Sequence, residues 1–587
     1  MSIEELDLPE AGPSRRAEAT YAALPLLNQP FVLNDALTRT YKAQYSNIYF
    51  QRLLQLRQIV ASAAERRWAH VKGSPQLLPN ILKVERSKLG YIIGTIYMEM
   101  PLKPNILEDL ARDNWTAPPP PRPKFYSPND VIHLEDERGR VTLVGDRLRE
   151  EIEKPGGGLV TGKYFSIPLL GRTRKLTTLS PRPPLGVVVA ALGMETASGD
   201  FEVIDICYAG LPPLAAPASD PSNQIPDKAT TIKGKGKAKQ EPVKKVAQAI
   251  AMDVDGSEDV EPQWVALISG VSAGSAEVPE DLKTQLLVEW LVGEGGGMED
   301  QLGGARVASL ILAGNSLSQP VRNEDDRKPV SGSSIAESHR VFLIDDEPAQ
   351  KRYGYDASTY TPHPTQTLDA FLTDVLSSGL PVQVLPGGED PVGITLPQQP
   401  FPRAMMRNAA MGGGEALHML TNPCWFELSG KSFLGIGGQT LDDIYKYLPT
   451  DDRLSMARRT LEWRHIAPTA PDTLWCFPFA DKDPFIIERR PHIYFVGNQP
   501  EFKTGLVGDS GQRTRIVLLP KFADTGIVTL VNVNSADLEC RTLQIGIPEW
   551  DAKKVKVTLT QEEIEAERQR SAIVRSDLDM MNEDEGW

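Results

Sequence analysis

The chain has 587 residues, which predicts several folded domains rather than one. Its 41% hydrophobic and 24% charged residues exclude a chain that is disordered throughout, while 48 prolines indicate extensive loops. The formal net charge of -15 excludes a protein that coats DNA, because phosphate backbones bind basic surfaces.

Cysteine spacing and hydropathy bear on the compartment. The four cysteines lie far apart and show no CxxC spacing, so we expect neither a zinc cluster nor a disulfide framework. No apolar run approaches the ~18 residues of a membrane span, and the start, MSIEELDLPEAGPSRR, lacks the apolar core of a signal peptide. We therefore expect an intracellular protein that binds no membrane.

The first part of the chain is predicted to form a helix and a small barrel. We expect disorder over residues 1–35, with Asn34 and Asp35 able to cap a helix whose apolar residues recur at helical spacing from Tyr41 to Val60. Five β-rich runs follow: YIIGTIYMEM (91–100), VIHLED (131–136), RVTLVG (140–145), VVVAALG (187–193) and FEVIDICYAG (201–210). Short strands separated by turns suit an OB-fold β-barrel, so we assign residues 36–215 to a helix and OB-fold domain.

A change of composition predicts a disordered, charged linker over residues 216–262. The segment is rich in Pro, Ala and Ser, and it contains KGKGKAK (233–239) followed by the acidic run MDVDGSEDVE. Two interpretations of its lysines stay open. They form a solvated tether, or they continue into Lys244 and Lys245 as a nuclear-import signal.

Residues 263–547 alternate strand, loop and helix, which predicts an α/β domain with a partly parallel sheet. Later β-like runs predict a second sheet packed on the first: PHIYFVG (491–497), RIVLLP (515–520) and GIVTLVNV (526–533). Residues 548–587 form a tail in which Thr560 and Glu563 have the spacing of a capping box. We expect that tail to be frayed or dependent on a partner.

Four loops follow predicted strands at the sheet edge where α/β folds bind ligands. They are Ser269-Gly270-Val271, Gly314-Asn315-Ser316, Gly387-Gly388-Glu389-Asp390 and Gly497-Asn498-Gln499-Pro500. Their order resembles the metal-binding loops of calcineurin-like phosphoesterases, with the patterns D-x-H, G-D-x-x-D, G-N-H-D/E and G-H-x-H.

Most ligand positions of that pattern carry other residues here. A two-metal site needs a bridging carboxylate and a full set of oxygen and imidazole ligands. Asp390 keeps a familiar ligand type, beside Glu389 where a histidine is expected. The replaced positions are Ser269, Val271, Asn315, Ser318, Gly388, Asn498 and Pro500. We expect these degenerate loops to hold no metal, and weak residual binding is the alternative.

The remaining motifs do not indicate an enzyme. His465 lies in the polar run RHIAPTAPDTL, where we interpret it as a structural histidine that ties an irregular loop rather than a catalytic one. There is no G-x-S-x-G for nucleophilic hydrolysis and no G-x-x-x-x-G-K-[ST] for nucleotide binding. We predict no catalytic residue and no cofactor.

The whole arrangement resembles the B-subunits of eukaryotic replicative DNA polymerases, and among them the second subunits of DNA polymerase delta. The strings that carry the resemblance are YSNIYFQRLLQLR (45–57), IGTIYMEMPLKPNIL (93–107), HLEDERGRVTL (133–143), LPQQP (396–400), RHIAPTAPDTL (464–474) and YFVGNQPEF (494–502). The implied fold is a helix and OB-fold barrel associated with a calcineurin-like, two-sheet α/β domain that lacks its metal site.

The resemblance also implies a role and partners. The family's B-subunit is a nuclear, non-catalytic scaffold that docks the cysteine-rich C-terminal module of the catalytic subunit and the N-terminal domain of the third subunit. The catalytic subunit of the translesion polymerase zeta is expected to use the same subunit, and the sliding clamp is expected to be an indirect partner. Little direct DNA binding is implied.

The chain departs from the family within the barrel. Removing Lys163 to Gly186 would join LVTG to VVVAALG and restore a compact connection between strands. Two interpretations stay open, a translated intron and a genuine surface loop. The linker and the tail are further departures, because the first is longer than expected and the second has no counterpart.

Two other functions compete with the scaffold. A residual phosphodiesterase or 3'-exonuclease would depend on Asp390. Binding of single-stranded DNA through the barrel would need basic groups interleaved with exposed aromatics, whereas the strands at 131–136 and 201–210 carry acids. We therefore favour protein contact for the OB-fold.

Overall fold

The computed structural model describes most of the chain. The described residues are 16, 18–33, 44–103, 122–157, 161–162, 185–215, 262–274, 278–318, 363–508 and 512–546. Among them no helix combines the length and the apolar character needed to cross a membrane. The predicted tail, and nearly all of the predicted linker and of the 163–186 insertion, lie outside these residues.

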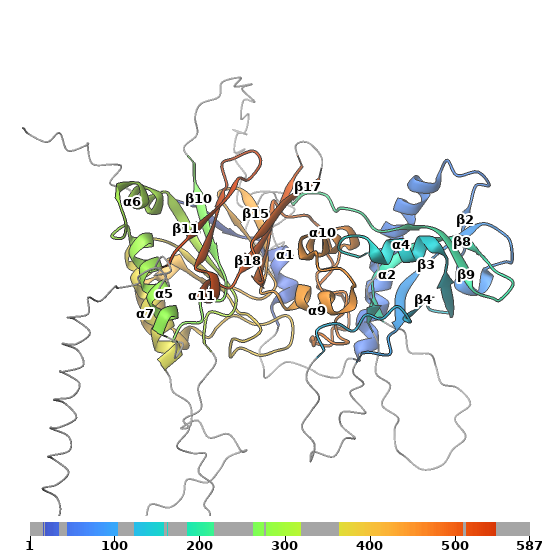
Figure 1. The fold of residues 1–587 in the computed structure, drawn as a ribbon, viewed down its shortest axis with the longest axis horizontal. Coiled ribbons are helices and arrows are strands. Elements are labelled where there is room, and N and C mark those ends of the chain that lie inside the picture. The colour runs from blue at the N-terminus through green and yellow to red at the C-terminus, as the bar shows by residue number, and fades with distance from the viewer. Residues whose placement is uncertain are drawn as a thin grey trace, which may run out of the picture. The chain divides into compact units, whose positions relative to one another are not determined.

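Helix α2 (Tyr45–Trp68) is the predicted leading helix. Its side chains at helical spacing, among them Ile48, Leu53, Leu56 and Val60, are almost completely buried. The helix packs on strands of the barrel (Figure 1). The residues that we expected to cap it, Asn34 and Asp35, lie outside the described residues.

The five predicted barrel strands form a closed ring in an OB-fold arrangement. They are β3 (Gly90–Glu99), β4 (Val131–Glu135), β5 (Arg140–Val144), β8 (Val188–Glu195) and β9 (Phe201–Cys207). Strand β3 pairs with both β4 and β8, and β5 pairs with β9, which closes the sheet on itself. Shorter elements adjoin the ring: β2 (Gln76–Leu77), η2 (Ile81–Lys83), α4 (Asp146–Glu153), β6 (Thr161–Gly162) and β7 (Leu185–Gly186).

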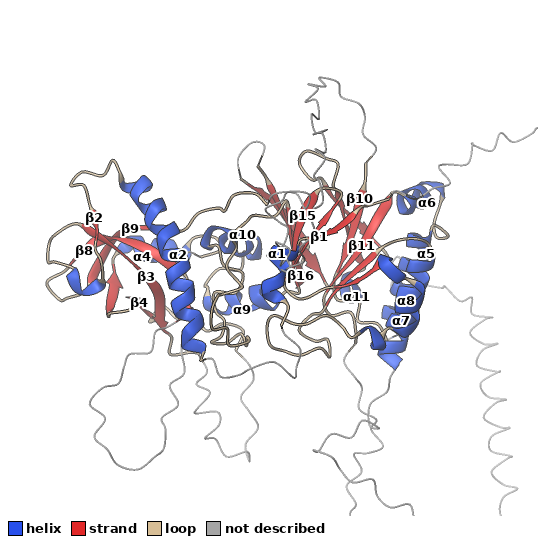
Figure 2. Cartoon of the chain, turned by 180° about the vertical axis from the view of Figure 1, so that it is seen from behind, coloured by secondary structure: helices blue, strands red, loops and turns tan. Residues whose placement is uncertain are grey.

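The first sheet of the α/β part has six strands, in the order β13-β12-β11-β10-β19-β20. Their bounds are β10 (Trp264–Ile268), β11 (Val307–Ala313), β12 (Val382–Leu385), β13 (Leu417–Met419), β19 (Ile527–Asn532) and β20 (Cys540–Gln544). Strands β10 to β13 are parallel, as the strand and helix alternation predicts. Helices pack together beyond β11 (Figure 2): α5 (Val278–Val292), α6 (Met298–Ala305), α7 (His363–Ser377) and α8 (Arg407–Gly412).

The second sheet also has six strands, in the order β1-β14-β15-β16-β18-β17. Their bounds are β1 (Tyr21–Ala23), β14 (Cys424–Leu428), β15 (Lys431–Ile436), β16 (Ile493–Gln499), β17 (Lys503–Val507) and β18 (Thr514–Pro520). The remaining described helices are α1 (Pro25–Asn28), η1 (Gln29–Phe31), η6 (Arg403–Met405), η7 (Gly414–Ala416), α9 (Gln439–Tyr447), α10 (Arg453–Trp463) and α11 (Phe522–Thr525). Buried side chains of both sheets, such as Ile311 and Phe495, share one core cluster, so the sheets pack face to face.

One strand belongs to a different sheet from the one that we predicted. The run GIVTLVNV forms β19, which pairs antiparallel with β10 in the first sheet rather than with β16 or β18 in the second. An apolar run shows that a strand is buried, but it does not show which neighbour supplies its hydrogen bonds. The two-sheet prediction is therefore right and this assignment is wrong.

The predicted disorder of residues 1–35 is wrong for residues 18–33. Strand β1 pairs antiparallel with β14, with Tyr21 opposite Leu428. Next to it, Leu24 and Phe31 are buried, and the side chain of Asn28 accepts a hydrogen bond from the backbone of Trp425. The segment is proline-punctuated and polar, and its order depends on partners about 400 residues away, which local sequence does not reveal.

Candidate functional site

The four loops singled out in the sequence lie together at the carboxyl ends of the central strands. Gly270 donates its backbone N–H to the Gly314 carbonyl at 2.9 Å, which joins the first two loops. The backbone N–H of Glu389 bonds to Asn315 Oδ1 at 3.0 Å, and that of Asn498 bonds to Ser269 Oγ at 2.8 Å. The four loops that the sequence singled out are therefore neighbours in the fold.

Two asparagines hold these loops in a conformation that suits few residues. Asn315 and Asn498 have φ angles of 52° and 54°, in the left-handed region that asparagine tolerates better than most side chains. Gly387 passes so close that a Cβ atom there would lie 2.2 Å from Asn315 Oδ1. At these two replaced ligand positions, the asparagines thus allow the backbone conformation that the loops adopt.

The carboxylate of Asp390 is hydrogen-bonded to backbone N–H groups. It is 4% exposed, and its carboxylate oxygens accept hydrogen bonds from the N–H groups of Leu317 at 3.0 Å and Gly387 at 2.7 Å. Burial raises the pKa of Asp390, and the backbone N–H donors oppose that shift. The carboxylate ties two loops together, so its oxygens have little capacity left for a metal ion.

The other predicted positions are also structural or exposed. Ser269 Oγ donates to the carbonyls of Leu519 and Pro520, and Val271 is buried in the apolar core. Ser318 donates its backbone N–H to the Ala273 carbonyl. Gly388 lies against Gln439, and Pro500 is exposed beyond β16.

The donor set does not fit a two-metal centre. Glu389 forms an ion pair with Lys521, with 3.4 Å between Oε1 and Nζ. No group of three or more His, Cys, Asp or Glu side chains in the described part of the chain could hold a metal ion. Asp390 is thus bound to backbone N–H groups and Glu389 lies beside an ammonium, whereas a two-metal centre uses carboxylates that are free to bind the ions.

An amide network next to the loops was missed from the sequence. Gln398 Nε2 donates to the Gly387 carbonyl at 2.8 Å, and Gln398 Oε1 accepts from Asn422 and Gln439, both at 2.8 Å. Gln398 belongs to the string LPQQP, which we used for the resemblance without assigning it a role. The feature of the sequence that could have indicated this network is the pair of glutamines between two prolines.

A second polar cluster joins helix α2 to the α/β part. Arg52 is 1% exposed, and its Nε lies 2.7 Å from Asp483 Oδ2. The same guanidinium donates to the carbonyls of Pro468 and Ala470. These bonds attach the leading helix to the RHIAPTAPDTL loop.

His465 completes this cluster. Its Nδ1 accepts the N–H of Ala467, so Nε2 carries the proton and donates to Asp483 Oδ2 at 2.8 Å. Burial, together with the nearby Arg52 charge, lowers the pKa of His465 to about 4. The Arg52 and His465 contacts hold the pKa of Asp483 below its usual range. The histidine ties the loop, as we predicted, whereas we assigned no role to Arg52 from the sequence.

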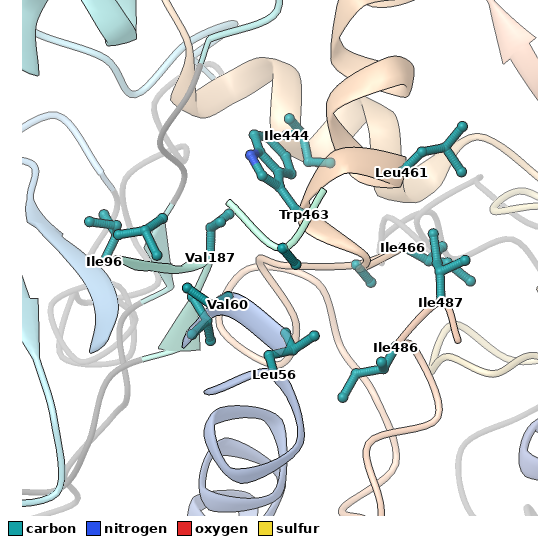
Figure 3. Packing of buried hydrophobic residues seen from close by; sticks show 14 of the residues in the cluster. Leu56, Val60, Ile96, Val187, Ile444, Leu461, Trp463, Ile466, Ile486 and Ile487 are labelled. Atoms are coloured by element: carbon teal, nitrogen blue, oxygen red, sulfur yellow. The ribbon is translucent and has the colours of Figure 1, made fainter. Parts of the chain in front are cut away.

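Apolar side chains surround this cluster and form one core across the two parts. Figure 3 shows Leu56 and Val60 of α2 and Ile96 of the barrel facing Trp463 and Ile466 of the α/β part. On another side, Lys103 pairs with Asp472, whose carboxylate also accepts a bond from the Tyr447 hydroxyl at 3.1 Å. We call this contact region, built around Arg52, Asp483 and His465, the junction.

Comparisons with known proteins agree with this architecture. The family model of the DNA polymerase delta subunit OB-fold domain matches residues 44–174, and that of the DNA polymerase alpha/epsilon B-subunit matches residues 265–504. The crystal structure of TT1561 of Thermus thermophilus covers 48% of this chain and 99% of its own, at 12% identity and a TM-score of 0.23, which is too low to bear on the fold.

Relatives that align over most of the chain give the family assignment. The DNA polymerase delta small subunit of Arabidopsis thaliana is 33% identical over 85% of this chain and 90% of its own length. The small subunits of Oryza sativa subsp. japonica and Saccharomyces cerevisiae are 32% and 29% identical, over 85% and 87% of this chain and 92% and 91% of theirs. This chain therefore belongs to the family of DNA polymerase delta small subunits.

Proposed function

We propose that this chain is the nuclear, non-catalytic scaffold subunit of DNA polymerase delta. In this role it links the cysteine-rich C-terminal module of the catalytic subunit to the N-terminal domain of the third subunit during replication and repair. The catalytic subunit of polymerase zeta would use the same surfaces, and the sliding clamp would be reached indirectly. The observation that carries the proposal is the junction.

A scaffold has to hold two binding surfaces in a fixed relation. At the junction, a buried ion pair and a continuous apolar core fasten α2 and the barrel to the α/β part. Buried charged pairs are costly to break because separation leaves an uncompensated charge in a dry environment. This supports a chain in which the barrel and the α/β part carry partners as one unit.

The loop cluster supports the non-catalytic part of the proposal. Asp390, on which the competing phosphodiesterase would depend, accepts two backbone hydrogen bonds, and Glu389 is paired with Lys521. A purified chain that cleaves oligonucleotides with Mn²⁺, and loses that activity in Asp390→Ala, would replace the scaffold by the phosphodiesterase.

The direct test is reconstitution. We expect the full chain to form a stable ternary complex with the catalytic subunit's C-terminal module and the third subunit's N-terminal domain, measured by size-exclusion chromatography with light scattering. Each partner should also raise the thermal stability of the chain by mass action. Failure to bind either partner at micromolar concentration would contradict the proposal.

A further inference from the structure

A fifth segment, which we did not predict from the sequence, reaches the loop cluster. Lys521 lies directly after strand β18 and before helix α11, opposite Ser269 of the first loop. The backbone N–H of Phe522 donates to the Ser269 carbonyl at 2.8 Å. The backbone N–H of Ala523 donates to the Gly270 carbonyl at 3.0 Å. These bonds to consecutive carbonyls give Lys521 a fixed place beside the first loop.

The side chain of Lys521 crosses the loop cluster at a glycine. Gly270 has a φ angle of 62°, and a Cβ atom placed there would lie 3.0 Å from Lys521 Cγ and 3.0 Å from Asn498 Oδ1. The lysine stem is therefore close to both the first loop and the fourth. Asn498 Oδ1 is shielded from solvent, and no donor in the described residues bonds to it. At the end of the stem, Nζ is 3.4 Å from Glu389 Oε1, so one lysine lies beside three of the four loops.

The loop cluster has two carboxylates on consecutive residues, Glu389 and Asp390. Asp390 is buried against backbone N–H groups, so Glu389 is the carboxylate that faces a cation. Neighbouring like charges disfavour each other, and an opposite charge close by relieves that repulsion. In a metal-dependent site the bound ions supply the positive charge. Here the ammonium of Lys521 supplies it, and a second cation brought to the same place would be repelled.

We propose that the Lys521 ammonium is a built-in counter-ion of the loop cluster, which takes the place of a metal ion beside Glu389 and keeps divalent cations out. Lysine suits this role because its ammonium is a compact point charge on a flexible stem. The role is separate from the scaffold, since it concerns the loop cluster alone. It also differs from that of an ordinary surface ion pair, such as Lys88 and Glu85 in the barrel part, which has no such loops around it.

Charge reversal in the full chain tests the proposal. Lys521→Glu places a second carboxylate beside Glu389 and near Asn498 Oδ1, and such oxygen ligands suit Mn²⁺. Lys521→Arg keeps the positive charge. The matched control is Lys88→Glu, which changes an exposed lysine whose Nζ lies 3.2 Å from Glu85 Oε2 and leaves the loops as they are. Titration with Mn²⁺, followed by electron paramagnetic resonance of the free ion, measures the affinity of each protein.

We expect Lys521→Glu to bind one Mn²⁺ about 10-fold or more tightly than the wild type does, because a repelling charge becomes an attracting one. Adding Glu389→Gln should remove that gain. Lys521→Arg and Lys88→Glu should bind Mn²⁺ no better than the wild type. An equal gain in Lys88→Glu would overturn the proposal, because any two neighbouring glutamates would then suffice. So would a gain in Lys521→Arg, or a wild type that binds Mn²⁺ as tightly as Lys521→Glu.

A neutral variant provides the test if Lys521→Glu does not fold. Lys521→Gln removes the ammonium without adding a carboxylate, so Glu389 loses its counter-ion while the loops keep their other contacts. We expect the folded Lys521→Gln protein to bind Mn²⁺ about 3-fold or more tightly than the wild type does. Circular dichroism and the melting temperature establish that each protein is folded. An unchanged Mn²⁺ affinity in folded Lys521→Gln would overturn the proposal, because the ammonium would then not keep divalent cations out.

Discussion

The loop cluster and the junction are both polar, but they differ in what their side chains do. In the loop cluster, Asp390 and the asparagines bond mostly to backbone, and the ion pair between Glu389 and Lys521 is more than a third exposed. At the junction, Arg52 and His465 both bond to the carboxylate of Asp483, and all three side chains have almost no access to water. The loops that match a metal-binding motif therefore hold only a partly exposed ion pair, whereas the junction, for which the sequence shows no such motif, holds a buried one.

The largest expected effect comes from removing the cation at the junction. Arg52→Ala leaves Asp483 buried without its guanidinium partner, which we expect to cost about 3–5 kcal/mol of unfolding free energy. Urea unfolding followed by fluorescence measures it. Arg66→Ala, on the exposed face of the same helix, should cost less than about 0.5 kcal/mol. Equal losses of unfolding free energy in the two variants would show that the buried ion pair of Arg52 does not stabilise the chain more than an exposed arginine does.

The junction should also make stability depend on pH. The pKa of His465 is lowered to about 4 in the folded chain, so the folded state binds its proton less readily than the unfolded state does. The contribution of His465 to the unfolding free energy is fully present above about pH 6.5. It falls as the pH drops toward 4, by about 3 kcal/mol in total.

His465→Asn should be less stable at neutral pH and should lose less stability between pH 6.5 and 4 than the wild type. Unfolding curves at several pH values measure that difference. The pKa of His492 is also lowered to about 4. Its contribution to the change of unfolding free energy with pH is the same in both proteins, so it cancels from the comparison. If the unfolding free energy of His465→Asn changed with pH as much as that of the wild type, His465 would not be the source of the pH dependence.

A smaller effect is expected in the loop cluster. Asp390→Ala removes the acceptor of the Leu317 and Gly387 N–H groups and should cost about 1–3 kcal/mol, because buried donors would be left without partners. The thermal midpoint measures this loss. Addition of Mn²⁺ or EDTA should shift the midpoint of neither protein. A Mn²⁺-dependent stabilisation of the wild type that the variant lacks would instead identify Asp390 as a ligand.

The smallest effect should come from Lys521→Ala. Its ion pair with Glu389 is partly exposed, so we expect a loss of about 0.2–1 kcal/mol, which decreases with added salt. Unfolding at low and high ionic strength checks this. A loss as large as that of Arg52→Ala would mean that the ammonium holds the loops together.

The sequence predicted the elements well where their pattern is local. The five barrel strands, β10 to β12 and helix α2 were readable from apolar spacing and turns, and the four loops were found from their order after strands. Contacts between distant segments were not readable. The sheet of β19 depends on its pairing with β10, and β1 is a three-residue strand with no pattern of its own.

The junction could have been found in part. Arg52 occurs between Ile48 and Leu56 on a helix face that is otherwise apolar, and an arginine there predicts a buried partner. The sequence could not identify that partner, because Asp483 lies more than 400 residues further along the chain. The amide network of Gln398 was hidden for a similar reason, since neutral side chains carry no pattern of spacing.

The pairing of β1 with β14 has a consequence for synthesis on the ribosome. Tyr21 emerges about 400 residues before its partner Leu428, which at ~5–20 residues per second is a delay of roughly 20–80 s. The barrel, between them in the sequence, can fold during that interval. Strand β1 is then among the last of the described strands to be placed, and until that moment the edge of β14 is open to any other extended segment.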